Sequence, residues 1–304
     1  MERAKIKTKI VLSDDLEQYK NEKMEELYAD PLFLKWLEKN PLEKESVRAS
    51  LGIFLDFMDD QHYCEKCPGL EKCQKRLPYR VVTPLISNGE LEKKIQMCDK
   101  MMERHHLEQR FIARDFPDEW LDNDLYNKEN VDFVRARLSI LKCLASAIED
   151  TLHKGVYLYG NTRVGKSYLL ATFLVTYLRK HPKTKGAFID SPTRFKELLD
   201  LSFQDKALFQ QTLESYYEVD VLVLDDFGSG YMSDYIRDSI VYPIINQRLK
   251  MRKLTLFTSR FSLKQIETIF ALKSLGGKIQ AQQITDMIRA SIEKEIPLEG
   301  ISVY

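Results

Sequence analysis

The 304-residue sequence lacks any apolar run near the roughly 20 residues that a membrane-spanning helix needs. It also lacks an excess of either charge: 46 basic residues balance 46 acidic ones, which argues against strong non-specific attraction to nucleic acid over the whole surface. The N-terminal stretch has neither the apolar segment nor the small-residue cleavage site of a secretory signal. Cysteine is scarce, and an odd count of five argues against a disulfide framework. We therefore expect a cytoplasmic protein.

Apolar strands and amphipathic helices alternate along the second part of the chain. Strands that are separated by helices pair in parallel, so this order predicts an α/β fold with a parallel sheet covered on both faces. Helices are expected at about 131–150, before the first of these strands, at 166–180, directly after it, and at about 280–294, the last one. The expected strands are 156–159, 186–190, 220–225 and 254–258.

The first hundred residues follow another pattern. Up to about residue 60 they predict short helices, broken by Pro31 and Pro41. A segment rich in cysteine and proline follows, and then a charged amphipathic helix at about 90–110 that could link two domains. We therefore expect a small, mostly helical domain at 1–105 and an α/β domain at 111–304.

The segment GNTRVGKS at 160–167 fits the phosphate-loop pattern G-x4-G-K-[ST], with an apolar strand before it and a helix after it. Such a loop aims backbone N–H groups at phosphate oxygens from a helix N-terminus. Lys166 is expected to contact the β- and γ-phosphates, and Ser167 to hold Mg²⁺. The predicted nucleotide-binding residues are Gly160, Asn161, Thr162, Arg163, Val164, Gly165, Lys166, Ser167, Tyr168 and Asp225.

An apolar strand that ends in two carboxylates, VLVLDD, follows about 60 residues after the loop. In a parallel sheet this places the acids beside the phosphate loop. Asp225 is predicted to help hold Mg²⁺, and Asp226 to orient or activate water. Alone, such an ending often just meets a turn, but after a phosphate loop it indicates a nucleoside-triphosphate site.

Arg163 stands where many phosphate loops have a third glycine. Glycine is needed only where φ is unusual or where the backbone approaches the phosphates closely, and the general pattern leaves this position free. We therefore expect nucleotide binding to persist, with the cation favouring the anionic ligand. The alternative is a loop that has lost catalysis.

Three cysteines, Cys64, Cys67 and Cys73, have a spacing at which thiolates can converge on one structural Zn²⁺. The alternative is three free or buried thiols without a metal. A tetrahedral ion needs a fourth ligand, and the candidates are His62, which is nearest, and Cys98, His105 and His106.

Three segments together resemble the AAA+ domain of bacterial replicative helicase loaders of the DnaC/DnaI type. They are KGVYLYGNTRVGKSYLLA (154–171), VLVLDDFGSGYMSDYIRDSIVYPIINQR (221–248) and LTLFTSRFSLKQIE (254–267). The likeness covers about 111–296, and the cysteine cluster followed by a linker helix is similar in layout to the loaders' zinc-binding domain. The resemblance implies an AAA+ ATP-binding domain at 111–304 and a helicase-interaction domain with a zinc site at 1–105.

Three positions depart from that family's pattern. Arg163 lies in the loop, Arg260 replaces an asparagine that acts as polar sensor, and Gln283 stands where a trans-acting arginine is expected. A neutral amide cannot stabilise transition-state charge as an arginine does. On the resemblance, the catalytic roles fall to Asp226, Arg260 and Arg289. The departures indicate a weak ATPase, or one that has reassigned these roles.

The resemblance implies an ATP-dependent loader that delivers a hexameric replicative helicase onto single-stranded DNA during initiation or restart of replication. Its cofactors would be ATP, Mg²⁺ and structural Zn²⁺, and its AAA+ domain would self-associate. One alternative is a non-hydrolysing adaptor of the helicase with a structural nucleotide. Another is the ATPase subunit of a transposition system, against which the cysteine-bearing N-terminal region argues.

Overall fold

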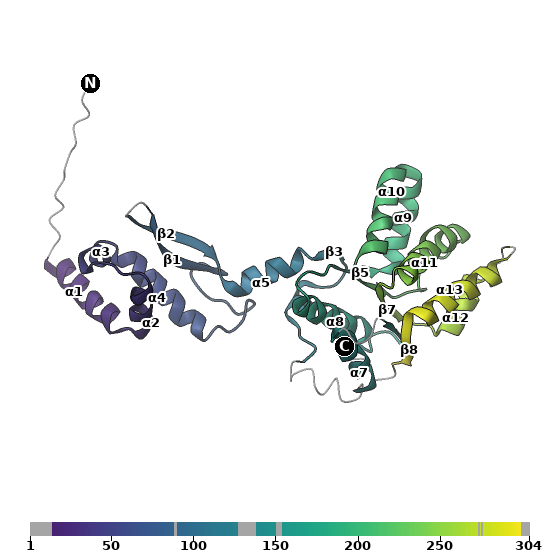
Figure 1. Ribbon diagram of the computed structural model, residues 1–304, viewed down its shortest axis with the longest axis horizontal. Coiled ribbons are helices and arrows are strands. Elements are labelled where there is room, and N and C mark those ends of the chain that lie inside the picture. Colours follow the sequence, from purple (N-terminus) through teal and green to yellow (C-terminus); the bar gives the residue numbers. More distant parts are fainter. Residues whose placement is uncertain are drawn as a thin grey trace, which may run out of the picture. The chain divides into compact units, whose positions relative to one another are not determined.

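The computed structural model describes residues 14–87, 90–126, 138–149, 154–272, 274 and 276–298. The chain divides into two compact units, Met1–Glu103 and Arg104–Tyr304, and each has a hydrophobic core of its own (Figure 1). Within the described ranges, no helix is both long enough and apolar enough to cross a bilayer.

The N-terminal unit begins with four helices, and the breaks before α2 and α3 fall at Pro31 and Pro41, as predicted. Asp30 caps α2 by accepting the N–H of Leu32, and Pro31 occupies the first turn. The buried rings of Phe33 and Phe54 meet edge to face at 5.4 Å in the core. The helices are α1 (Asp14–Ala29), α2 (Pro31–Lys39), α3 (Lys44–Ala49) and α4 (Leu51–Glu65).

A β-hairpin follows, which corrects the helix expected at 90–110. Strands β1 (Arg80–Ser87) and β2 (Glu90–Met97) are antiparallel, and only α5 (Asp99–Glu108) is helical. The charged residues of β2 also suit an amphipathic helix, but pairing with β1 satisfies their backbone groups and sets Ile95 opposite Val82.

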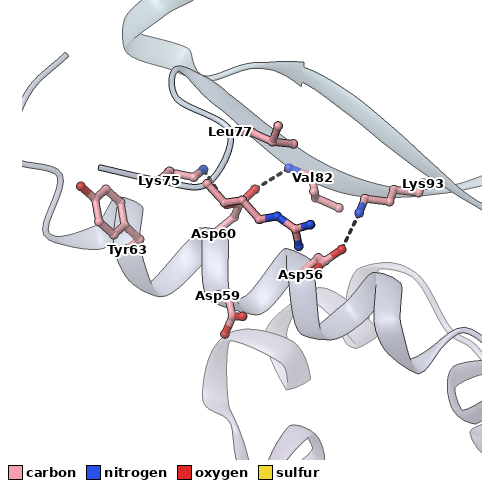
Figure 2. A pocket seen from close by; sticks show the side chains of 9 residues that line it. Asp56, Asp59, Asp60, Tyr63, Lys75, Leu77, Val82 and Lys93 are labelled. Carbon is pink, nitrogen blue, oxygen red and sulfur yellow. Dashed lines mark hydrogen bonds and ion pairs between the residues drawn. The ribbon is translucent and has the colours of Figure 1, made fainter. Parts of the chain in front are cut away.

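The hairpin is fixed to α4 by side chains of that helix (Figure 2). Asp60 accepts the backbone N–H of Val82 at 2.6 Å, and Asp56 pairs with Lys93 on β2. Asp60 also pairs at 2.7 Å with Lys75, whose side chain is only 6% exposed. These residues line a cavity of about 440 Å³ between the helix and the hairpin.

The C-terminal unit is a six-stranded sheet in the order β3-β5-β6-β7-β4-β8, with every neighbouring pair parallel. The predicted α/β parallel sheet is confirmed. The strands are β3 (Phe111–Arg114), β4 (Gly155–Tyr159), β5 (Gly186–Asp190), β6 (Val221–Asp225), β7 (Leu254–Ser259) and β8 (Ile292–Pro297).

Helices cover both faces of this sheet, so the central strands are buried on both sides. Along β4, Val156 and Leu158 join one apolar cluster, and Tyr157 joins the other. The covering helices are α7 (Leu138–Ile148), α8 (Lys166–Lys180), α9 (Ser191–Gln204), α10 (Lys206–Glu218), α11 (Tyr242–Lys250), α12 (Leu263–Phe270) and α13 (Gly277–Ser291), with a π-helical segment at Ile236–Val241 before α11.

The edge strands β3 and β8 are absent from the sequence-based prediction. Each pairs on one side only. In β8, IEKEIP, three charged residues separate Ile292 from Ile296, and this spacing also suits a continuation of the helix before it. The last helix therefore ends at Ser291, before the predicted 294. The first part of a helix expected at 131–150 lies outside the described residues.

Candidate nucleotide-binding site

The strand order brings the predicted phosphate-binding residues to one edge of the sheet. β7 lies between β4 and β6, so the loop after β4, Arg260 after β7 and the acid pair at the end of β6 are neighbours. The carboxyl ends of parallel strands are where ligands bind in such sheets.

Lys166 is the first residue of α8 and is only 7% exposed. Its Nζ donates to the backbone carbonyls of Gly160 at 3.0 Å and Asn161 at 2.7 Å. Burial lowers the pKa of Lys166, while the carboxylates of Asp226 and Asp225 act in the opposite direction. A buried ammonium group at a helix N-terminus, held by the carbonyls of a loop, fits an anionic ligand.

Arg163 has a left-handed backbone with φ of 62°. This conformation costs a non-glycine residue roughly 1–2 kcal/mol, which explains why glycine is common at this position of phosphate loops. Arginine is thus accommodated here at the cost of backbone strain, and its effect on nucleotide binding stays a prediction. Gly165, with φ of 82°, meets the same demand without strain.

Arg163→Gly should leave the unfolding free energy unchanged or raise it by up to about 1 kcal/mol, because relief of backbone strain outweighs the added entropy of the unfolded chain. Urea denaturation without nucleotide measures this change. Arg179→Gly, within regular helix α8, is a contrasting control that should destabilise the protein. A clear loss of stability in Arg163→Gly would contradict the strain argument.

Asp225 is held by two hydroxyl groups. Thr258 donates to its Oδ1, and Ser167 hydrogen-bonds to the same carboxyl group. Burial raises the pKa of Asp225, and both hydrogen bonds oppose that shift. The contact places the predicted Mg²⁺ ligands Ser167 and Asp225 side by side, and their oxygen donors suit this hard cation.

Asp226 forms an ion pair with Arg260, the residue at the predicted sensor position. Arg260 Nε donates to Oδ1 at 3.1 Å and Nη2 donates to Oδ2 at 3.0 Å, so the pair is bidentate. Ser229 Oγ also donates to Oδ1, at 2.7 Å. Neither Ser229 nor Thr258 is among the site residues that the sequence predicts, although a hydroxyl residue at the end of a buried strand, as at Thr258, is a signal for such a role.

Arg289 and Gln283 both lie on α13, where their side chains are exposed. Arg289 pairs with Asp286 at 2.7 Å and with Glu267 at 3.7 Å, which ties it to α13 and α12. These contacts do not link it to the phosphate loop, so its catalytic role stays a prediction.

The predicted zinc site is not assembled. Among the residues that the structure describes, no three His, Cys, Asp or Glu side chains form a group that could hold a metal. His62 is paired with Asp30 at 2.6 Å, and Lys75 Nζ lies 3.7 Å from Cys64 Sγ. His62 and Cys64 thus each have a partner that competes with a metal, and the described side chains do not form a zinc site in this arrangement.

The phosphate loop after β4 and the acid pair at the end of β6 define a P-loop nucleoside-triphosphate-binding domain with the AAA+ fold. No protein-family model matches the chain. The chain is 25% identical over 290 residues to the replicative helicase loader DnaI of Bacillus subtilis (strain 168), across 90% of this chain and 88% of that one. This likeness confirms the resemblance to loaders of the DnaC/DnaI type.

The chain is also similar to solved structures of DnaI and of the DnaC helicase loader. A crystal structure of DnaI is 24% identical, with a TM-score of 0.49, and covers 65% of this chain and 98% of its own. A crystal structure of the DnaC helicase loader is 23% identical, with a TM-score of 0.47, and covers 60% of this chain and 100% of its own.

Proposed function

We propose that the chain is an ATP-dependent loader that delivers a replicative DNA helicase onto single-stranded DNA at initiation or restart of replication. One observation carries this proposal: a phosphate loop and an acid pair meet at one sheet edge, in a chain that is similar over 90% of its length to a helicase loader. Such a protein would work in the cytoplasm, beside the chromosome.

The two units would have different binding functions. Residues 1–105 would bind the helicase. Residues 111–304 would bind ATP, with Mg²⁺ held by Ser167 and Asp225, and would associate with copies of the same domain. Gel filtration of the full chain with its own replicative helicase tests the partner assignment: we expect one co-eluting complex, and separate elution in the presence of ATP would contradict it.

A second candidate is a non-hydrolysing adaptor of the helicase. It is favoured by the contacts of Asp226, since hydrogen bonds from Arg260 and Ser229 occupy most of the acceptor sites with which the carboxylate would orient or activate water. Steady-state phosphate release in the presence of single-stranded DNA separates the candidates. If the chain is a loader that hydrolyses ATP, the wild type releases phosphate faster than Lys166→Ala. If it is an adaptor, the two rates are equal.

Exposed aromatic side chains support single-stranded DNA as a partner. Phe203 at the end of α9 is 76% exposed and stacks on Tyr235 with ring centroids 6.0 Å apart, and Tyr231 is 77% exposed. Aromatic faces in solvent provide stacking surfaces for unpaired bases, worth about 1–3 kcal/mol per base.

Phe203→Ala should therefore weaken binding of a fluorescent oligothymidine by about tenfold, as measured by anisotropy. Tyr126→Ala removes another aromatic side chain that is 57% exposed and serves as the matched control. Equal affinities of Phe203→Ala and Tyr126→Ala would show that the aromatic pair does not contact DNA.

Zinc in the N-terminal unit stays a prediction of the cysteine spacing. In its favour, a cavity of about 450 Å³ is lined by all four cysteines of this unit, Cys64, Cys67, Cys73 and Cys98. If it binds zinc, elemental analysis should find one ion per chain in the wild type and a large loss in Cys98→Ser. Cys143→Ser, in the other unit, should keep the full content. Far less than one zinc in the wild type would contradict the prediction.

A further inference from the structure

Arg260 stands between two sites that attract its positive charge. It directly follows β7, which has β6 with Asp226 on one side and β4 with the phosphate loop on the other. From this central position a long guanidinium side chain has an acid on one flank and a phosphate-binding loop on the other.

The carboxylate is the fixed member of the pair. Asp226 has a left-handed backbone with φ of 47°, and its N–H donates to Thr258 Oγ1 at 2.9 Å. Ser229, whose N–H donates to the Asp226 carbonyl at 3.1 Å, closes a turn around it. Arg260, in contrast, has a side chain that is 51% exposed. If one partner leaves the other, Arg260 is the one that moves.

The bond between them is also replaceable. An ion pair as exposed as this one stabilises a structure by up to about fivefold in an equilibrium constant. Phosphate offers a guanidinium the same two-pronged geometry with more charge, so it is the stronger acceptor.

We propose that Arg260 exchanges partners, so that its guanidinium leaves Asp226 for the terminal phosphate of bound ATP and thereby frees the carboxylate. The same side chain then distinguishes triphosphate from diphosphate, because ADP lacks the group that draws it away. This inference rests on the proposed nucleotide site, and it gives Arg260 a role that an asparagine at this position cannot fill.

Calorimetric titration of the full chain with ADP and with a non-hydrolysable ATP analogue, both with Mg²⁺, tests the exchange. Arg260→Asn should weaken binding of the analogue by about tenfold and change ADP binding by less than about twofold. Arg48→Asn, which removes an ion-paired arginine in the other unit, should change neither. An equal change for both nucleotides, or none, overturns the proposal.

Asp226→Asn provides the complementary arm, because a neutral amide no longer holds the guanidinium. It should strengthen analogue binding by about fivefold, and most of that gain should vanish when Arg260→Asn is also present. An equal gain in both backgrounds overturns the exchange. The nucleotide site is tested separately. Loss of ADP binding in Lys166→Ala supports the site, whatever the result for Arg260. If the wild type binds no nucleotide, both the proposed site and the proposed exchange are overturned.

Discussion

Lys166→Ala is expected to lower the affinity for ATP and for ADP by at least about a hundredfold. Lys166 Nζ is buried and donates hydrogen bonds to the loop carbonyls of Gly160 and Asn161. Its hydrogen bonds to phosphate oxygens would be charge-assisted, worth about 1.5–3 kcal/mol each. The remaining backbone N–H groups cannot replace that charge. Isothermal titration calorimetry with Mg²⁺ measures the loss.

Lys180→Ala is the matched control, since it removes an exposed lysine from the opposite end of the same helix. It should bind both nucleotides as the wild type does. Lys166→Ala should also fold normally, because its removal relieves the burial of an ammonium group. Equal nucleotide affinity in Lys166→Ala and the wild type would contradict the assignment of the site.

Arg248→Met should lower the unfolding free energy of the C-terminal unit by about 3–5 kcal/mol, the range expected when a buried charged group with a full set of partners is removed. Arg248 is 1% exposed and ties the end of α10 to the start of β7. Burial lowers the pKa of Arg248 to about 9, with Asp220 opposing the shift, so the side chain is charged at neutral pH. Its hydrogen-bond acceptors are Thr255 Oγ1 and the backbone carbonyls of Tyr216, Tyr217, Val219, Asp220 and Leu254.

Methionine matches the aliphatic part of the arginine side chain but donates no hydrogen bond to these carbonyls. Urea denaturation followed by far-ultraviolet circular dichroism measures the change, and Lys250→Met, an exposed position on the same helix α11, is the control. The control should shift stability by less than about 0.5 kcal/mol. A loss below about 1 kcal/mol in Arg248→Met would mean that water reaches those carbonyls.

The central sheet could be predicted because its strands are apolar runs that end in motifs of known geometry. β6 reads VLVLD and is buried on both faces, so its composition alone excludes an exposed helix. The hairpin could not be predicted in the same way. Half of residues 90–97 are charged and the segment suits a helix locally, whereas its pairing with β1, which sets Ile95 opposite Val82, selects a strand. Such pairing is a tertiary effect that overrides local preference.

In the candidate site, too, some features follow from the sequence and others only from the tertiary structure. The loop and the acid pair follow from spacing, because their geometry is fixed by the strands before them. The pairing of Arg260 with Asp226, 34 positions apart, follows only from the strand order. The sequence also gives no sign that His62 pairs with Asp30, which lies 32 positions before it.

Helicase loading on a single-stranded DNA circle tests the loader assignment most directly. The purified replicative helicase, the full-length chain and ATP are mixed with the circle, and DNA-bound helicase is separated and quantified. If the chain is a loader, the wild type with ATP raises the amount of bound helicase well above that of helicase alone, and Lys166→Ala does not. Loading that is no greater than with helicase alone, or that is equal with Lys166→Ala, would contradict the loader assignment.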